Sequence, residues 1–413
     1  MWNAPDMQRA PERAPLTDFQ TALWASHRLD SENTGHNAPL LVQWNCEIDA
    51  DRFERAFSEV VRTTDSLRTV FEQTAGEVFQ TAPDRVSYHL LRRDFSSQAD
   101  PRQAALAWIN EIAAQPHSLA TTPLRTALAR LGDQSWIWLL DQHHILTDYS
   151  SKSLILSRLD HFYKVGPQDA NPAGEYPSFV KLVPRIREDD DKAPLRMDGE
   201  TSDIFGERIV TTTDQPDPEM LVHQFCLACP DSTSLKARKD IFDHLGAALV
   251  GLVASISSKS QFQVGLVINR RKRLQAAEYC GPILRTDSLR ISLPENPTSA
   301  EIGQEWRRAV QEMKRNPGSP AEQLHHDRVI FNFTLDPLAD FNGSRTVEIS
   351  HEISTRDTSD GIRLTARPGS EQGTIRLILS LSAQMARATG GAKAVAQHFL
   401  TNHDFIVGEP SVR

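Results

Sequence analysis

The sequence predicts a mixed α/β protein with two lobes, and three observations support this prediction. Segments with apolar residues at every second position, as in strands, alternate with segments whose apolar residues recur at helical spacing. The chain has 413 residues, of which 39% are hydrophobic, and this is enough for two substantial cores. Between residues 165 and 205, glycine, proline, aspartate and lysine accumulate and interrupt the apolar pattern. This change of composition places the boundary between the lobes near residue 175.

The first half of the chain alternates predicted strands and helices. Residues 1–14 are polar and contain prolines, so we expect a flexible N-terminal arm before the first lobe, which spans residues 15–175. Apolar alternation over residues 40–44 predicts a strand, and Asp49 or Asp51 then begins an amphipathic helix. The next expected elements are a strand at LRTVF, a helix over residues 103–114 and a strand over residues 124–130.

The second predicted lobe spans residues 176–413 and has the same α/β texture. Residues 241–256 are apolar almost all round, which predicts a buried helix. The other elements expected in this lobe are a strand over residues 262–268, an amphipathic helix around Trp306, and strands over residues 328–335 and 374–382.

The first half is organised around one stretch, SWIWLLDQHHILTDYSSKSLILSRLDHFYK, which covers residues 135–164. Its beginning alternates as a strand, and its end carries apolar residues at helical spacing, with Ser150 and Ser151 available as N-caps. The turn between them, residues 142–149, can therefore present side chains from rigid elements on both sides. Turns of this kind are typical places for catalytic groups.

Two adjacent histidines and an aspartate lie in this turn. Histidine has an unperturbed pKa of about 6.5 and exchanges protons at neutral pH, so His143 or His144 is a candidate general base. Asp148 is close enough in sequence to affect their geometry or charge. The alternative interpretation of the HHxxxD pattern is that the three residues only cap the end of a strand.

Composition excludes several classes of function. The net charge of −9 disfavours a nucleic-acid-binding protein, because the chain has no overall basic excess for a phosphate backbone. A local basic run, Arg270 to Arg273, is the exception, and it is either a solvated loop or an attraction for an acidic partner. No window of about 18 or more uncharged apolar residues suggests a membrane span.

The cysteines and the N-terminus favour a cytoplasmic protein. Four cysteines do not make a disulfide framework, and the first residues lack the apolar segment of a signal peptide. Cys226 and Cys229 form a CxxC pair, but no second pair completes a four-ligand zinc site. We therefore expect no metal.

The turn and its surroundings resemble the condensation domains of nonribosomal peptide synthetases, whose signature is HHxxxDG. His143, His144 and Asp148 match the histidines and the aspartate of this signature. Tyr149 stands where the family has glycine, and this is a departure. Partial matches to other family motifs lie in the family's order along residues 16–335: LTDFQTALW, RTTDSLRTVF, PHSLATTPLRTALARL, CGPILRTDSLR and RVIFNF.

The resemblance implies both a fold and an activity. The implied fold is a pair of chloramphenicol-acetyltransferase-like lobes in a V-shaped pseudo-dimer, with the active site in a tunnel at their junction. The implied activity is transfer of an acyl group from the phosphopantetheine thioester of an acyl or peptidyl carrier protein to a small-molecule amine or hydroxyl. The product is an amide or an ester in natural-product biosynthesis. No adenylation, carrier or thioesterase segment fits within the chain, so we expect a free-standing enzyme, with an excised domain as the alternative.

The resemblance also implies roles for the residues of the turn. His144 matches the catalytic histidine, and His143 is expected to be a packed neighbour. Asp148 is expected to pair with an arginine from the second half, with Arg270 as the first choice and Arg271 as the second. The alternative role for Asp148 is an N-cap of the following helix. No bound cofactor is expected, because the substrate is carried on phosphopantetheine.

Tyr149 leaves alternatives open. Its ring is expected to narrow one entrance of the tunnel or to donate a hydrogen bond to substrate, which would suit an unusual acceptor. The competing hypotheses are a catalytically inactive module that recruits another protein to a synthetase, and a coenzyme A-dependent acyltransferase of the same fold.

Overall fold

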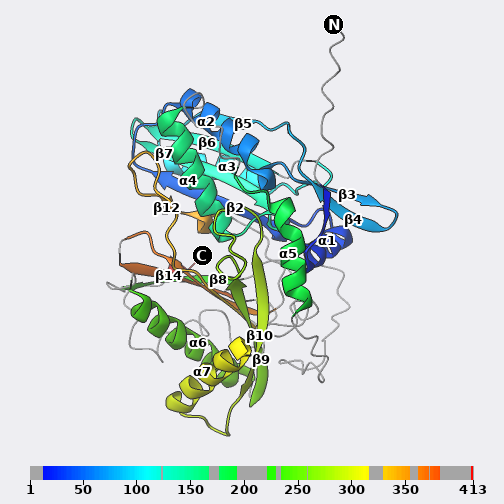
Figure 1. Cartoon of the computed structure of the whole chain (residues 1–413). Coiled ribbons are helices and arrows are strands. Elements are labelled where there is room, and N and C mark those ends of the chain that lie inside the picture. Colours follow the sequence, from blue (N-terminus) through cyan, green and yellow to red (C-terminus); the bar gives the residue numbers. More distant parts are fainter. Residues whose placement is uncertain are drawn as a thin grey trace, which may run out of the picture. The chain divides into compact units, whose positions relative to one another are not determined.

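The computed structural model describes residues 13–121, 124–166, 176–192, 221–228, 234–257, 259–315, 329–353, 361–371, 373–381 and 411–412 (Figure 1). The chain divides into two compact units. The first comprises Met1–Glu188, Arg271–Ile283 and Leu338–Thr355, and the second comprises Asp189–Arg270, Leu284–Pro337 and Arg356–Arg413. This division differs from the predicted lobes 15–175 and 176–413, because the first unit extends to Glu188 and two later segments of the chain pack into it.

A five-stranded sheet forms the centre of the first unit, with the order β12-β2-β7-β6-β5. Its central strand β7 (Ser135–His143) pairs antiparallel with β2 (Asn37–Trp44) and with β6 (Leu124–Gly132). The outer strands are β5 (Leu90–Asp94) and β12 (Val347–Glu348), and β12 comes from one of the two later segments. The strands predicted over residues 40–44 and 124–130 and before the histidines are confirmed.

Helices cover both faces of this sheet. Successive side chains of β7 point to opposite faces and are apolar on both, so both faces have to be buried. One face, which carries Trp138 and Leu140, packs against α2 (Ala50–Thr63) and α4 (Tyr149–Val165). The other face, which carries Ile137 and Leu139, packs against α3 (Pro101–Ala113). Trp138 stacks on Trp44 with ring centroids 5.7 Å apart. The end of β7 is therefore fixed between two apolar layers.

A smaller sheet and two helices complete the first unit. The sheet has the order β1-β4-β3, with β1 at Arg13–Pro15, β3 at Val70–Thr74 and β4 at Glu77–Thr81. The helices are α1 (Asp18–Leu29) and α5 (Phe179–Asp191), and α5 belongs to this unit up to Glu188. The predicted arm over residues 1–14 is wrong for Arg13 and Ala14, because β1 pairs with β4, and residues 1–12 lie outside the described residues. The LRTVF strand begins only at Val70, since a 3-10 turn occupies Asp65–Leu67.

The second unit contains a seven-stranded sheet with the order β10-β9-β11-β13-β14-β8-β15. Strand β11 runs parallel to β9 and β13, and the other neighbours are antiparallel. The strands are β8 (Leu221–Ala228), β9 (Gln261–Asn269), β10 (Leu284–Ser292), β11 (Val329–Phe333), β13 (Ile362–Pro368), β14 (Thr374–Leu381) and β15 (Ser411–Val412). The strands predicted near residues 262–268, 328–335 and 374–382 are confirmed.

Helices α6 (Leu235–Ser257) and α7 (Ser299–Arg315) pack on this sheet and build one core (Figure 1). Trp306 of α7 is fully buried, and a Cβ at Gly246 of α6 would lie 2.1 Å from its ring. Only glycine therefore permits this close approach of the two helices. The helices predicted over residues 241–256 and around Trp306 are confirmed.

Length and composition would also allow α6 to cross a membrane, with a mean hydropathy of 1.4. A single helix of this kind is weak evidence, because core helices of soluble proteins meet the same criterion. Leu245, Leu249 and Val253 of α6 are buried in the core of the second unit. Their packing accounts for part of the apolar composition of the helix, since 39% of its apolar window is buried.

Candidate active site

The predicted turn lies at the end of β7. The strand ends at His143, a 3-10 turn covers His144–Leu146, and α4 begins at Tyr149. Asp148 is the N-cap of α4, because its Oδ1 accepts a hydrogen bond of 2.8 Å from the backbone N–H of Ser151. The expectation that Ser150 or Ser151 caps this helix is wrong, since Asp148 precedes them in extended conformation.

His143 lies on the buried side of the turn, with 1% of its surface exposed. Its Nδ1 accepts a hydrogen bond of 3.2 Å from the backbone N–H of Ile145, which requires the proton to be on Nε2. Three other imidazole rings surround it, with centroids at 5.2 Å (His27), 5.6 Å (His36) and 6.5 Å (His117). Burial, with smaller effects from these histidines and His144, lowers the pKa of His143 to about 2. His143 is therefore a neutral packed residue.

His144 lies on the more accessible side and is only partly buried. Its Nδ1 is 3.0 Å from the carbonyl oxygen of Thr147. A carbonyl can only accept, so Nδ1 donates and the lone pair of the neutral ring lies on Nε2. The ring of Phe19 meets the imidazole edge-on at a centroid distance of 5.4 Å. The two histidines thus have opposite tautomers, with the proton of His143 on Nε2 and that of His144 on Nδ1.

Asp148 forms a buried ion pair with Arg271, at 2.6 Å between Oδ2 and Nη1. The same Oδ2 accepts a hydrogen bond of 3.0 Å from the backbone N–H of Ile283. Burial by itself would raise the pKa of Asp148, but Arg271 and the N–H groups of Ser151 and Ile283 lower it below its ordinary value. The carboxylate is therefore ionised and both of its oxygens are used, so the ion-pair and N-cap roles hold together.

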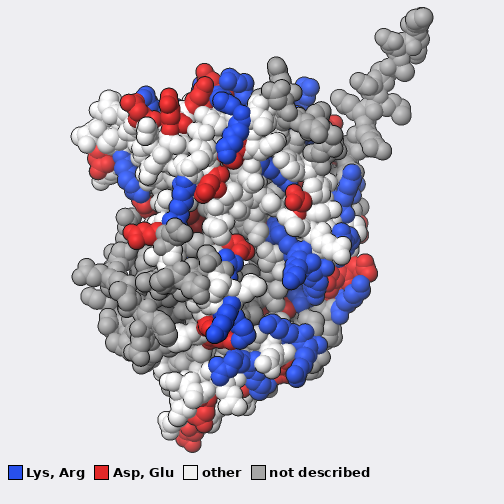
Figure 2. All heavy atoms as spheres, turned by 60° about the vertical axis from the view of Figure 1, so that its left-hand side comes forward, with Lys and Arg blue, Asp and Glu red and all other residues white. Residues whose placement is uncertain are grey.

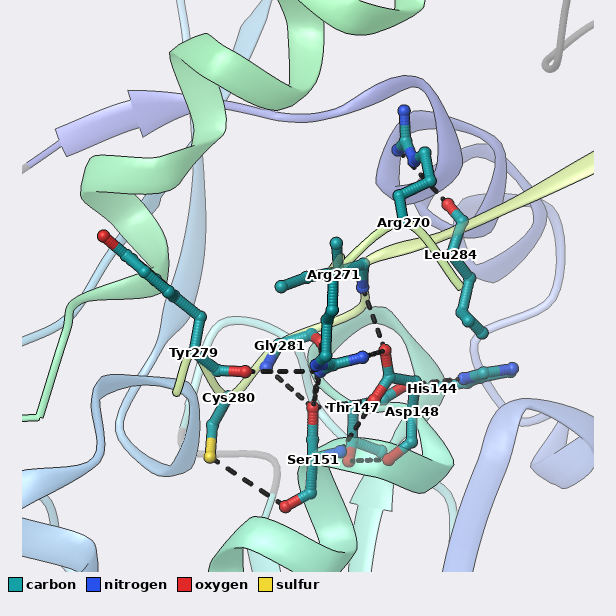
Figure 3. A network of polar contacts seen from close by, with 11 residues as sticks. His144, Thr147, Asp148, Ser151, Arg270, Arg271, Tyr279, Cys280, Gly281 and Leu284 are labelled. Carbon is teal, nitrogen blue, oxygen red and sulfur yellow. Dashed lines mark hydrogen bonds and ion pairs between the residues drawn. The ribbon is translucent and has the colours of Figure 1, made fainter. Parts of the chain in front are cut away.

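Figure 3 shows how Arg271 holds the start of α4. Its Nη2 donates to the hydroxyl of Ser151 at 2.8 Å and to the carbonyl of Gly281 at 3.0 Å. The backbone N–H of Gly281 donates to the same hydroxyl at 2.8 Å. The segment Arg271–Ile283, which is remote in sequence, is thereby joined to Asp148 and Ser151.

The prediction of Arg270 as the partner of Asp148 is wrong. Arg270 instead pairs with Asp190 and, at 3.1 Å, with Asp189. The resemblance did not distinguish Arg270 from Arg271, because the two are adjacent in the sequence. In the structure their side chains pair with different partners, Arg270 with Asp189 and Asp190 and Arg271 with Asp148.

Comparison with known proteins supports the predicted resemblance. Residues 11–193 match the family model of the condensation domain. Among solved structures, the starter condensation domain of rhizomide synthetase aligns with a TM-score of 0.74 and 18% identity, covering 94% of this chain and 95% of that one. The first condensation domain of the calcium-dependent antibiotic synthetase, in complex with a substrate analogue, aligns with a TM-score of 0.75 and 18% identity over 94% and 95% of the two chains. The chain has a condensation-domain fold. The predicted chloramphenicol-acetyltransferase-like α/β class is confirmed.

Curated relatives are large synthetases, of which the chain spans a small part. One linear gramicidin synthase protein from Brevibacillus parabrevis is 24% identical over 340 residues, which cover 76% of this chain and 4% of that protein. Isonitrile lipopeptide synthase from Streptomyces coeruleorubidus is 30% identical over 154 residues, which cover 37% of this chain and 10% of that protein.

Tyr149, the departure from the condensation-domain signature, has an ordinary backbone. It is the first residue of α4, and it is not among the described residues with positive φ. Its ring is partly buried and packs against the core formed by α2, α4 and the sheet. The replacement of glycine therefore needs no backbone strain at this position.

Several residues around the histidines were not predicted. His27, His36 and His117 surround His143, and His117 bonds through Nε2 to Asp141 at 3.2 Å. They come from separate elements, so no spacing in the sequence connects them. The CxxC pair stays untested, because Cys229 lies outside the described residues. Among the described residues, no group of three or more histidine, cysteine, aspartate or glutamate side chains is arranged to hold a metal.

Proposed function

We propose that the chain is a condensation-type acyltransferase that joins an acyl group to an amine, forming an amide, or to a hydroxyl, forming an ester. The acyl donor is a thioester on the phosphopantetheine of an acyl or peptidyl carrier protein. The observation that carries this proposal is the orientation of His144, whose Nδ1 donates to the carbonyl of Thr147 and whose Nε2 keeps its lone pair. The condensation-domain fold supports the same reaction class.

In the proposed reaction, the acceptor nitrogen or oxygen attacks the thioester carbonyl carbon. His144 Nε2 takes the proton of the acceptor as the new bond forms. The tetrahedral intermediate then collapses, the carbon–sulfur bond breaks, and the phosphopantetheine sulfur leaves and receives the proton from His144. The products are an amide or ester and a free carrier thiol.

Positioning and proton transfer contribute to the rate in this mechanism. Holding the acceptor beside the carbonyl carbon lowers the barrier by several kcal/mol, and a placed base contributes about 3–5 kcal/mol. The thioester is already activated, so we propose that no bound cofactor is required.

A carrier protein with acidic side chains would have to use a local basic surface. On the face shown in Figure 2, Lys and Arg side chains gather over the lower half with a few Asp and Glu side chains among them, although the overall charge is −9. In the basic run of the sequence, Arg270 and Arg271 are buried in ion pairs, whereas Lys272 and Arg273 are exposed. We propose that, of this run, only the two exposed residues take part in docking, on a protein that works in the cytoplasm.

The test is intact-protein mass spectrometry of acyl-loaded carrier protein, incubated with the enzyme and a panel of amines and alcohols. Loss of the acyl group with formation of a new amide or ester, abolished in His144→Ala, is the expected result. Retention of the acyl group across the panel would overturn the proposal. Detectable binding of a carrier or synthetase in that case would favour a recruitment module.

A further inference from the structure

One buried amide connects α1 to the histidine turn. Gln20 of α1 is fully buried, and its Nε2 donates to the carbonyl oxygen of Ile145 at 3.1 Å. Ile145 directly follows His144 and belongs to the same 3-10 turn. A helix near the start of the described chain therefore holds the backbone next to the proposed base.

The other hydrogen-bonding positions of the Gln20 amide are also occupied. Its Nε2 donates to Oε1 of Gln80 at 3.0 Å, and Nε2 of Gln80 donates back to Oε1 of Gln20 at 2.8 Å. The Oε1 atom of Gln20 also accepts from the backbone N–H of Thr17 at 3.1 Å. An amide offers two donors and two acceptor lone pairs, and all four are used here. This saturation fixes the rotamer of Gln20 and the direction of its N–H groups.

Apolar contacts hold the same turn from the same side. Phe19 precedes Gln20 and meets the His144 ring edge-on at 5.4 Å. Ile145 and Leu146 are buried in a small core with Leu16 and Phe71, against which Leu23 and Trp24 of α1 pack. Helix α1 thus contacts both the imidazole of His144 and the backbone that follows it.

We propose that Gln20 is a positioning residue for His144. The Gln20–Ile145 bond fixes the 3-10 turn, whose geometry brings the carbonyl of Thr147 to the Nδ1 atom of His144. Gln20 touches neither substrate nor the reacting atoms in this role. The role in turnover rests on the proposed function, whereas the effect on the His144 ring does not.

The test combines two substitutions at Gln20 with a matched control. Gln20→Leu removes every side-chain hydrogen bond at similar volume. Gln20→Glu keeps the acceptor for Thr17 and Gln80 but, when ionised, loses both donors, the one to Ile145 and the one to Gln80. The control is Gln142→Leu, because Gln142 is also buried and lies two residues before His144, but its Nε2 approaches the carbonyl of Ser66 at 3.5 Å instead of the turn.

Turnover of the acyl-loaded carrier is measured well below the unfolding temperature of each variant. Gln20→Leu is expected to lower kcat about 10- to 100-fold with KM within about twofold, since misplacement of a catalytic group affects the chemical step. Gln142→Leu should stay within about threefold. In Gln20→Glu, the ratio of its kcat to that of the wild type should rise as pH falls, because a protonated buried carboxyl regains a donor. In Gln20→Leu this ratio should be independent of pH.

A second measurement does not depend on activity. The 15N spectrum of the histidine side chains, with His144 assigned from its loss in His144→Ala, reports which ring nitrogen carries the proton. We expect a protonated Nδ1 in the wild type and in Gln142→Leu, and a shifted tautomer population in Gln20→Leu. An unchanged His144 signal, or an unchanged kcat, in Gln20→Leu would overturn the positioning role. A shifted signal in a protein that transfers no acyl group would uphold that role and overturn the proposed function.

Discussion

The two sides of the histidine turn differ, although their residues are adjacent in sequence. On the buried side, His143 accepts a hydrogen bond at Nδ1 and has a pKa of about 2, and Asp148 is locked to Arg271. On the accessible side, His144 donates from Nδ1 and keeps the lone pair on Nε2. The same turn therefore has a buried side and an accessible side with different roles. The buried side holds the structure, and the accessible side carries the histidine that we propose as the base.

The largest expected effect tests this division directly by giving both histidines the same substitution. His144→Phe should lower kcat about 10²- to 10⁴-fold, the range for loss of a general base, with little change in the unfolding midpoint. His143→Phe should lower kcat less than His144→Phe does, because this ring has no part in proton transfer and acts only through its hydrogen bond to the Ile145 N–H. Steady-state kinetics and urea unfolding on both variants measure the two effects. A similar loss of kcat in both variants would contradict the division.

The next largest effect concerns the buried ion pair. Asp148→Ala leaves Arg271 uncompensated and removes the N-cap of α4, so we expect a loss of about 3–5 kcal/mol in unfolding free energy. Asp148→Asn keeps a capping side chain and separates the loss of charge from the loss of the cap. A surface control is Arg62→Ala, which breaks a pair with Glu59 and should cost less than about 1 kcal/mol. Equal stability of Asp148→Ala and wild type in urea would show that the pair does not stabilise the turn.

The smallest effect sharpens the comparison through pH. His143 is neutral in the folded protein down to a pKa of about 2, whereas the unfolded chain protonates it near its ordinary value of 6.5. The unfolded state therefore binds more protons between these values, and stability falls as pH falls below about 6.5.

Between pH 7.5 and 5.5, His143 should contribute a loss of about 1.4 kcal/mol, which His143→Phe would remove. Burial also lowers the pKa of His27, so part of the pH dependence should remain in this variant. Urea unfolding at a series of pH values gives the slopes. If the unfolding free energy of His143→Phe depends on pH as steeply as that of the wild type, the protonation that lowers stability occurs on another group.

Local patterns were enough to predict the main elements of the fold. The alternation in β7, the helical spacing in α4 and the apolar run of α6 depend on neighbouring residues, and each is confirmed. The order of motifs along the chain also predicted the condensation-domain fold. Such patterns are short in range, because they reflect the repeat of the strand or helix itself.

Three features were decided only by the tertiary structure. The choice of Arg271 over Arg270, the histidines around His143, and the bond from Gln20 to Ile145 each depend on segments far apart in sequence. The sequence by itself determined that two histidines and an aspartate would share a turn between a strand and a helix. Only the packing around that turn decided which groups bury His143 and which carbonyl orients His144. Burial and hydrogen-bond direction are properties of the whole surroundings of a residue, and no local spacing encodes them.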